Sequence, residues 1–312
     1  MARPLASLHH SLQMSASVWI HVGVEKTGST LIERTLRELG DLKARFGIAN
    51  IDRDAINRHP WYQYLRGFSE EHTLPDPRKW AGLQADFFRD FDAEGACLLS
   101  HEFLIGSANR GFYRGAEAVC EHLKGMFAGR QVGLIVYVKR QDLHLESLYK
   151  QALQAGGSLP WKSFIHKKMD WRRHDWINLI DRLVSVIGSE NLKVKPSELL
   201  NEGFQPFMRD FLETVGINWE GPVPEPAFTN LSYSVPGLEI ARIGHQWVDE
   251  EGRRDLRMFL LKHFTRKDQP KPVFFTPEER REILDFHAPT NAKLFADYMP
   301  AYSKFSYANA AV

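Results

Sequence analysis

A strand, a glycine-containing loop and a helix follow one another near the start of the chain, and this order constrains the fold most. Residues 18–24 form a β-branched run typical of a buried parallel strand. In the loop at residues 23–28, four residues separate two glycines, and residues 31–39 carry apolar side chains at helical spacing. Such a loop points backbone N–H groups at an anion, and the helix adds its positive N-terminal end. The sequence therefore predicts an anion site at the start of an α/β domain.

Strands and helices continue to alternate along the chain. Further strands are predicted at residues 96–100, 132–138 and 192–195. Helices are predicted at residues 143–153, 176–186, 206–215, 237–248, 256–263 and 277–299, the last with a break at Pro289. This alternation predicts a central parallel sheet flanked by helices, in the P-loop nucleotide-kinase-like arrangement. We expect one α/β domain over residues 1–312, with an N-terminal extension at 1–17, a helical insertion and a mostly helical C-terminal part at 227–312.

Charge and cysteine content exclude several classes of protein. The 40 Lys and Arg residues balance 39 Asp and Glu residues, so no bulk positive field indicates a nucleic-acid partner. Two cysteines, Cys97 and Cys120, do not make a disulfide framework, which favours a reducing compartment. No apolar stretch reaches the roughly 20 residues needed to span a membrane, and residues 1–17 lack the hydrophobic region of a signal peptide. We expect a cytoplasmic protein without a transmembrane segment; its oligomeric state is left open.

The position of the loop lysine indicates which anion the loop binds. A nucleotide-hydrolysing P-loop closes with Gly-Lys-Ser/Thr, whereas here Ser29 and Thr30 follow Gly28 and the lysine is Lys26, inside the loop. A γ-phosphoryl group carries about two charges and normally requires a metal ion in transfer. A sulfuryl group carries one, so a lysine and several N–H groups suffice. The loop therefore favours sulfuryl transfer without a metal; a tight turn with an exposed lysine is the alternative.

Residues 21–30, with the sequence HVGVEKTGST, resemble the 5′-phosphosulfate loop of sulfotransferases that use 3′-phosphoadenosine 5′-phosphosulfate (PAPS). The bacterial carbohydrate-type branch is the most similar. The resemblance implies that Lys26 contacts the bridging oxygen and the sulfuryl group. It also implies that the residues after the lysine hold the 5′-phosphate. These residues are Thr27, Gly28, Ser29 and Thr30.

A second motif of the same family lies near the strand at residues 132–138. The family places an arginine at the end of a middle strand and a serine eight positions later, and together they bind the 3′-phosphate. Ser147 matches the serine, whereas Lys139 stands eight positions before it and Arg140 is adjacent. Lysine supplies charge but not the bidentate fork of arginine. Lys139 is favoured by its spacing from Ser147, and Arg140 stays the alternative. If the pair has no binding role, it is a solvated turn.

The acceptor hydroxyl must lose its proton, and His101 and Glu102 follow the strand at residues 96–100. Open α/β sheets build their sites at the carboxyl ends of strands. Family members use a histidine or a glutamate here, and the carbohydrate branch often has Ser-x-Glu, which matches Ser100 and Glu102. Adjacent strand residues point to opposite faces, so Glu102 is expected to be the base and His101 the alternative. We expect Lys26 to keep the pKa of Glu102 low enough for ionisation at neutral pH.

Weaker similarities extend the resemblance over residues 18–299, including an Asn-x-Ser element at Asn230 and Ser232. The aromatic cluster Trp61, Tyr62 and Tyr64 has the composition of a sugar-contacting surface, although ordinary packing also explains it. The resemblance implies transfer of a sulfuryl group from PAPS to a hydroxyl acceptor, a carbohydrate or glycoconjugate. A P-loop kinase of a small metabolite and a non-catalytic nucleotide-binding protein on the same fold are the alternatives.

Overall fold

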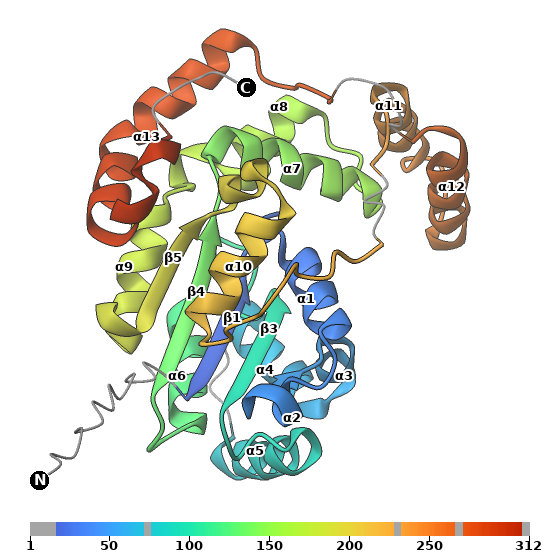
Figure 1. Ribbon diagram of the computed structural model, residues 1–312. Coiled ribbons are helices and arrows are strands. Elements are labelled where there is room, and N and C mark those ends of the chain that lie inside the picture. Colours follow the sequence, from blue (N-terminus) through green and yellow to red (C-terminus); the bar gives the residue numbers. More distant parts are fainter. Residues whose placement is uncertain (1–16, 72–75, 228–231, 266–270, 308–312) are drawn as a thin grey trace, which may run out of the picture.

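Parallel strands form one central sheet in the computed structural model, which describes residues 17–71, 76–227, 232–265 and 271–307. Within these residues the sheet has five strands in the order β2-β3-β1-β4-β5, all parallel. The strands are β1 (Val18–Gly23), β2 (Ala49–Ile51), β3 (Cys97–Glu102), β4 (Val132–Val138) and β5 (Leu192–Pro196). The predicted parallel α/β fold is confirmed, and the carboxyl ends of β1, β3 and β4 lie next to one another at one edge (Figure 1).

Helices occupy the connections between strands and most of the chain after β5. Before β3 lie α1 (Ser29–Glu38), α2 (Leu42–Phe46), α3 (Arg53–Arg58), α4 (Pro60–Glu71) and α5 (Pro77–Phe91), and before β4 lies α6 (Ala116–Met126). Between β4 and β5 lie α7 (Gln141–Gln154), α8 (Trp161–Ser163), α9 (Trp176–Ile187) and the turns η1 (Phe164–Met169), η2 (Trp171–Arg173) and η3 (Ser189–Asn191). After β5 come η4 (Ser197–Glu202), α10 (Phe204–Thr214), α11 (Val235–Gly244), α12 (Glu250–His263), α13 (Pro277–Tyr298) and η5 (Pro300–Phe305). Figure 1 shows α11 and α12 standing apart from the sheet.

The strands are buried on both faces because their side chains alternate between two apolar layers. In β1, Val18 and Ile20 pack into the layer formed with α4, α6 and α9, whereas Trp19 packs with α1 and α10. In β4, Val136 and Tyr137 divide in the same way. A strand buried on both sides reads as a continuous apolar run, which is why β1 and β4 are evident in the sequence.

Among the strands of the described residues, β2 is the one that the sequence does not predict. It has three residues and pairs with β3, with Ala49 opposite Cys97 and Ile51 opposite Leu99. A three-residue segment is too short to show a period of two, so its pairing with β3 rather than its own pattern defines it.

The predicted break at Pro289 is wrong, because α13 continues through this residue to Tyr298. A proline removes one helix hydrogen bond, but the helix on both sides is held by packing. Leu284 and Leu294 are buried, and Asn291 is fixed by its amide contact with Gln141 at 2.7 Å. Tertiary contacts with α7 and α9 therefore keep the helix in place.

Some predictions fall outside the described residues. Almost all of the predicted N-terminal extension and Asn230 of the Asn-x-Ser element are among them. In the part of the chain that the structure describes, no helix has the length and apolar character needed to cross a membrane.

Candidate active site

The loop after β1 lies directly against the end of β3. A Cβ atom at Gly23 would lie 2.8 Å from the Cα atom of Glu102 and 2.6 Å from Oγ of Ser29, so only glycine fits there. The loop then turns through left-handed conformations, with φ of 64° at Lys26 and 105° at Gly28. A lysine in this region is uncommon and its cost is borne by the surrounding contacts. This tight turn brings Lys26 next to the carboxyl end of β3.

The first turn of α1 has features of an anion site. Gly28 is its N-cap, and among the described residues no side chain caps this end and no acidic residue stands in the first turn. Ser29 Oγ is buried without a hydrogen-bond partner there. The hydroxyl of Thr27 instead donates to the carbonyl of Val24 at 2.7 Å and closes the loop. The predicted residues Thr27, Gly28, Ser29 and Thr30 therefore share one loop and helix start, with open donors for an anion.

Glu25, which the sequence analysis does not identify, holds the loop against the segment that follows β3. Its buried carboxylate accepts hydrogen bonds from Oγ of Ser107 at 2.5 Å, from the amide of Ala108 at 3.2 Å and from the hydroxyl of Tyr113. Nε2 of His144, on α7, donates to the carbonyl of Glu25 at 2.7 Å. The loop is thus tied to the segment after β3 and to α7, which restricts the position of Lys26.

Two buried carboxylates share one guanidinium at the end of β3. Nη1 of Arg53 on α3 lies 2.7 Å from Oε2 of Glu33 on α1 and 3.7 Å from Oε2 of Glu102. Glu33 also accepts the backbone N–H of Glu102 at 3.3 Å. Glu102 in turn accepts a hydrogen bond from the backbone amide of Lys26. The predicted pair Lys26 and Glu102 therefore meet, and Glu33 and Arg53 join them.

Burial decides how these carboxylates titrate. It raises the pKa of Glu33 from 4.5 to about 7, although Arg53 opposes the change. Burial also raises the pKa of Glu102, against the opposing charges of Arg53 and Lys26. The expected lowering by Lys26 is present but is smaller than the effect of burial. Glu102 is thus a stronger base than an exposed glutamate.

His101 titrates in the opposite direction. Burial, aided by the charge of Arg53, lowers its pKa to about 3. Nε2 of His101 lies 3.0 Å from Oδ1 of Asn57, and its ring contacts that of Tyr62 with centroids 4.2 Å apart. The imidazole is therefore neutral near pH 7 and engaged in packing and hydrogen bonding.

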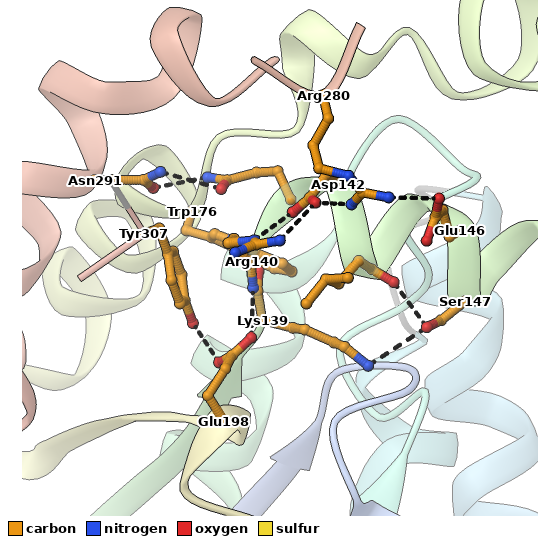
Figure 2. Close-up of polar contacts among 12 residues, drawn as sticks. Lys139, Arg140, Asp142, Glu146, Ser147, Trp176, Glu198, Arg280, Asn291 and Tyr307 are labelled. Carbon is orange, nitrogen blue, oxygen red and sulfur yellow. Dashed lines mark hydrogen bonds and ion pairs between the residues drawn. The ribbon is translucent and has the colours of Figure 1, made fainter. Parts of the chain in front are cut away.

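At the end of β4, Lys139 and Arg140, the two candidate ligands of the 3′-phosphate, point in different directions. Nζ of Lys139 lies 3.4 Å from Oγ of Ser147 (Figure 2). It also lies 3.4 Å from the carbonyl of Lys26. Arg140 turns the other way, and its guanidinium pairs with the buried carboxylate of Asp142 at 2.7 and 2.9 Å. Burial lowers the pKa of Lys139 to about 8, although the nearby charge of Glu198 raises it. Of the two basic residues, Lys139 is the one beside Ser147 and the anion loop.

A buried ionic network holds the Lys139–Arg140 turn in place (Figure 2). Asp142, with a fully buried side chain, also pairs with Arg280 of α13, which lies 3.0 Å from Glu146. The turn itself is fixed by its backbone. The amide of Arg140 donates to Glu198 at 2.9 Å, and the indole of Trp176 donates to the carbonyl of Lys139 at 2.7 Å. The segments around β4 thus present the Lys139 side chain in one direction.

A cavity of about 410 Å³ opens beside the end of β3. Its lining residues are Arg53, Asn57, Tyr62, Arg66, His101, Phe103, Gly106, Ser107, Asn109 and Arg110. Of the aromatic residues considered as sugar contacts, only Tyr62 is among them. Trp61 is fully buried in the core, and Tyr64 packs on Trp80. The packing interpretation therefore holds for two of the three.

The sequence analysis does not identify several residues of the site. Arg53 follows the helix cap Asp52, and nothing in that local pattern relates it to Glu102. Glu33 lies among the apolar positions of α1, and this placement of a charged residue is the one signal that the sequence offers. Glu25 could have been found as the second charged residue inside the anion loop. Among the residues that the structure describes, no group of three or more His, Cys, Asp or Glu side chains is placed to hold a metal ion.

We compared the chain with known proteins, first by sequence. No family model matches the chain. A protein of Archaeoglobus fulgidus described as uncharacterized is 27% identical over 176 residues, which cover 55% of this chain and 47% of that protein. The chain thus aligns with about half the length of this curated relative.

Solved structures give a more extensive match. The sulfotransferase from Alicyclobacillus acidocaldarius aligns with a TM-score of 0.50 and 16% identity, covering 89% of this chain and 94% of that one. A sulfotransferase domain from the curacin biosynthetic pathway aligns with a TM-score of 0.38 and 13% identity, covering 89% and 96%. The first alignment shows that the chain has a sulfotransferase-type α/β fold, as residues 21–30 and 139–147 predict. At this level of identity the comparison defines the fold, and the activity is argued from the site.

Proposed function

We propose that the protein transfers a sulfuryl group from PAPS to a hydroxyl acceptor, a carbohydrate or glycoconjugate. The observation that carries this proposal is the meeting of Lys26, Glu102 and the Lys139–Ser147 pair at the adjoining carboxyl ends of β1, β3 and β4. A cation, a base and a second anion site are the groups that this transfer requires.

The residues fit a nucleotide that carries two separate anionic groups. The start of α1, with the buried hydroxyl of Ser29 and no side-chain cap among the described residues, suits the 5′-phosphosulfate. Lys139 and Ser147, on the other side of the Lys26 carbonyl, suit the 3′-phosphate. Arg140 is assigned a structural role because its guanidinium is paired with Asp142.

Glu102 is the better candidate for the base. A general base works best when its pKa approaches the working pH. Burial moves the pKa of Glu102 upward, in that direction, and moves the pKa of His101 down to about 3. We therefore assign proton removal to Glu102 and give His101 the role of positioning the cavity wall through Asn57 and Tyr62.

In this reaction the acceptor oxygen bonds to sulfur as the bond between sulfur and the bridging oxygen of PAPS breaks. Glu102 accepts the hydroxyl proton and later releases it to water. Lys26 stabilises the negative charge that develops on the bridging oxygen. The products are a sulfate ester and 3′-phosphoadenosine 5′-phosphate (PAP).

Calorimetric titration with PAP and with Mg-ATP tests the nucleotide. We expect PAP to bind in the presence of a chelator and Mg-ATP to bind more weakly, because the loop has no lysine after Gly28. Equal or tighter binding of Mg-ATP would contradict the proposal and favour a small-metabolite kinase.

Sulfate transfer from labelled PAPS to a panel of sugars, glycolipids and phenols tests the reaction. We expect Lys26→Ala to reduce transfer by about 10²- to 10³-fold, as loss of a charge-stabilising group does in other enzymes. Lys167→Ala, at an exposed position on η1, is the matched control and should leave transfer unchanged. Tight PAP binding without transfer to any acceptor would support a non-catalytic nucleotide-binding protein instead.

A further inference from the structure

Three guanidinium groups line the cavity beside Glu102, and they come from three different segments. Arg53 belongs to α3, Arg66 to α4, and Arg110 to the segment after β3. Separate elements have thus brought arginines to one cavity wall. The cavity volume of about 410 Å³ lies within the ~300–1,000 Å³ typical of small-molecule sites.

We propose that the acceptor is acidic, and that Arg66 and Arg110 bind a carboxylate or sulfate group that it already carries. This inference rests on the proposed function, because it assigns the acceptor of the same transfer site. Arginine binds both kinds of group through a planar fork of N–H donors, so the two share one recognition chemistry.

The arginines differ in how exposed they are, because Arg53 is partly buried whereas Arg66 and Arg110 are exposed. Arg53 lies between Glu33 and Glu102, so its charge serves the buried carboxylates next to the reacting centre. Arg66 and Arg110 are exposed at the cavity, where a ligand can reach them from solvent. Their position matches the outer end of an acceptor whose hydroxyl reaches inward toward Glu102.

The inner wall carries neutral groups suited to a hydroxylated ligand. Tyr62 and His101 are buried there, and the partly buried Asn57 and Ser107 supply amide and hydroxyl groups. None of the ten lining residues in the described part of the chain is aspartate or glutamate. The cavity lining therefore combines positive charge at the exposed side with neutral polar contacts inside, which is the complement of an acidic sugar.

Matched acceptors provide the test. Uronate-containing oligosaccharides are compared with the same oligosaccharides after reduction of each carboxylate to an alcohol, and neutral oligosaccharides are compared with their singly sulfated forms. We expect kcat/KM for sulfate transfer from labelled PAPS to be at least about tenfold higher for the acidic member of one pair or both. A preference within the uronate pair indicates that the arginines bind a carboxylate, and a preference within the sulfated pair indicates that they bind a sulfate. The preference should decrease as salt is raised, because the arginines are exposed.

Variants connect the preference to the two arginines. Arg66→Gln and Arg110→Gln should each reduce the acid preference, and the double variant should abolish it while PAP affinity is retained. Arg78→Gln removes an exposed charge on α5 outside the cavity and is the control that should keep the preference. The ratio of the two acceptors within each variant corrects for any loss of folded protein.

The outcomes separate this inference from the proposed function. Transfer that is equal or faster to the neutral member of every pair would overturn the inference while leaving the sulfotransferase assignment standing. An acid preference that persists in the double variant would also overturn it. Absence of both PAP binding and transfer would instead contradict the proposed function itself.

Discussion

The ends of β3 and β4 both bury carboxylates beside arginines, but they balance the charges differently. At β4, two arginines, Arg140 and Arg280, face Asp142 and Glu146 with contacts of 2.7 to 3.0 Å. Glu146 additionally accepts the amide of Phe274 at 3.0 Å. This cluster balances two guanidiniums with two carboxylates and satisfies them with hydrogen bonds.

At β3, one guanidinium contacts both carboxylates, because Arg53 lies 2.7 Å from Glu33 and 3.7 Å from Glu102. Burial raises the pKa of both. A carboxylate with a raised pKa exchanges protons more readily near neutral pH. The β4 carboxylates are instead engaged in close contacts with two guanidiniums. This difference supports the proposed roles, in which the β4 cluster keeps the local structure in place and the β3 cluster moves a proton.

Removal of the proposed base tests most directly whether the two clusters have different roles. We expect Glu102→Gln to lower kcat by about 10²- to 10⁴-fold, the usual contribution of a general base. Its stability to urea should change little or rise, because glutamine relieves the desolvation that raises the pKa of Glu102. In the wild-type enzyme, kcat should increase with pH, because the base must be ionised. The midpoint of this increase should lie above 4.5, the ordinary pKa of glutamate.

His101→Asn is the companion variant for this experiment. It should retain most of kcat, because a group with a pKa of about 3 is a weak base at neutral pH. A Glu102→Gln enzyme with near wild-type kcat, together with an inactive His101→Asn enzyme, would reverse the assignment of the base.

The β4 cluster should respond in the opposite manner. Asp142→Asn leaves Arg140 and Arg280 buried without their shared counter-charge, which costs about 3 to 5 kcal/mol in comparable buried pairs. We expect that loss in the free energy of unfolding by urea. Asp54→Asn, which removes an exposed partner of Arg37, should cost about 1 kcal/mol or less. A loss at Asp142 as small as that at Asp54 would show that the cluster is not a structural device.

Much of the fold could be predicted because its main signals are local. The double burial of β1 and β4 produces continuous apolar runs, and helix α9 shows its period within a few turns. Strand β2 and the passage of α13 through Pro289 depend instead on partners distant in sequence. Local patterns carry no information about such partners, so these two features could not be predicted.

The candidate site divides along the same line. Lys26, Glu102 and Lys139 lie at the ends of strands that the sequence reveals, and a motif marks each of them. Arg53 and Arg280 reach the site from helices whose own sequence shows no reason for the contact. The choice between Lys139 and Arg140 also required the structure, because the two residues are adjacent in the sequence. The structure shows that Arg140 pairs with the buried Asp142, whereas Lys139 lies beside Ser147.

Titration of Glu33 tests the effect of burial at a residue that contacts the proposed base through the backbone N–H of Glu102 and through Arg53. Its pKa is about 7 in the folded protein and near 4.5 when exposed, so the folded state prefers the protonated form. Its contribution to stability is complete below pH 4.5 and is lost as the pH rises toward 7. We expect the unfolding free energy of the wild type, measured against Glu33→Gln, to fall over this range by on the order of 3 kcal/mol. Glu38→Gln, exposed on the same helix, should show no such trend; a flat difference for Glu33 would contradict the role of burial.

The pH dependence of PAP binding tests the nucleotide half of the site. Burial gives Lys139 a pKa of about 8, so the free protein loses this positive charge as the pH rises through that value. Since the 3′-phosphate binds the charged form, calorimetry should show PAP affinity nearly constant from pH 7 to 8. Above pH 8, affinity should weaken by up to about tenfold per pH unit. Lys139→Arg should remove this decline, because arginine stays charged throughout. A wild-type affinity that is constant to pH 10 would show that Lys139 does not bind the nucleotide and that the β4 end only shapes the sheet edge.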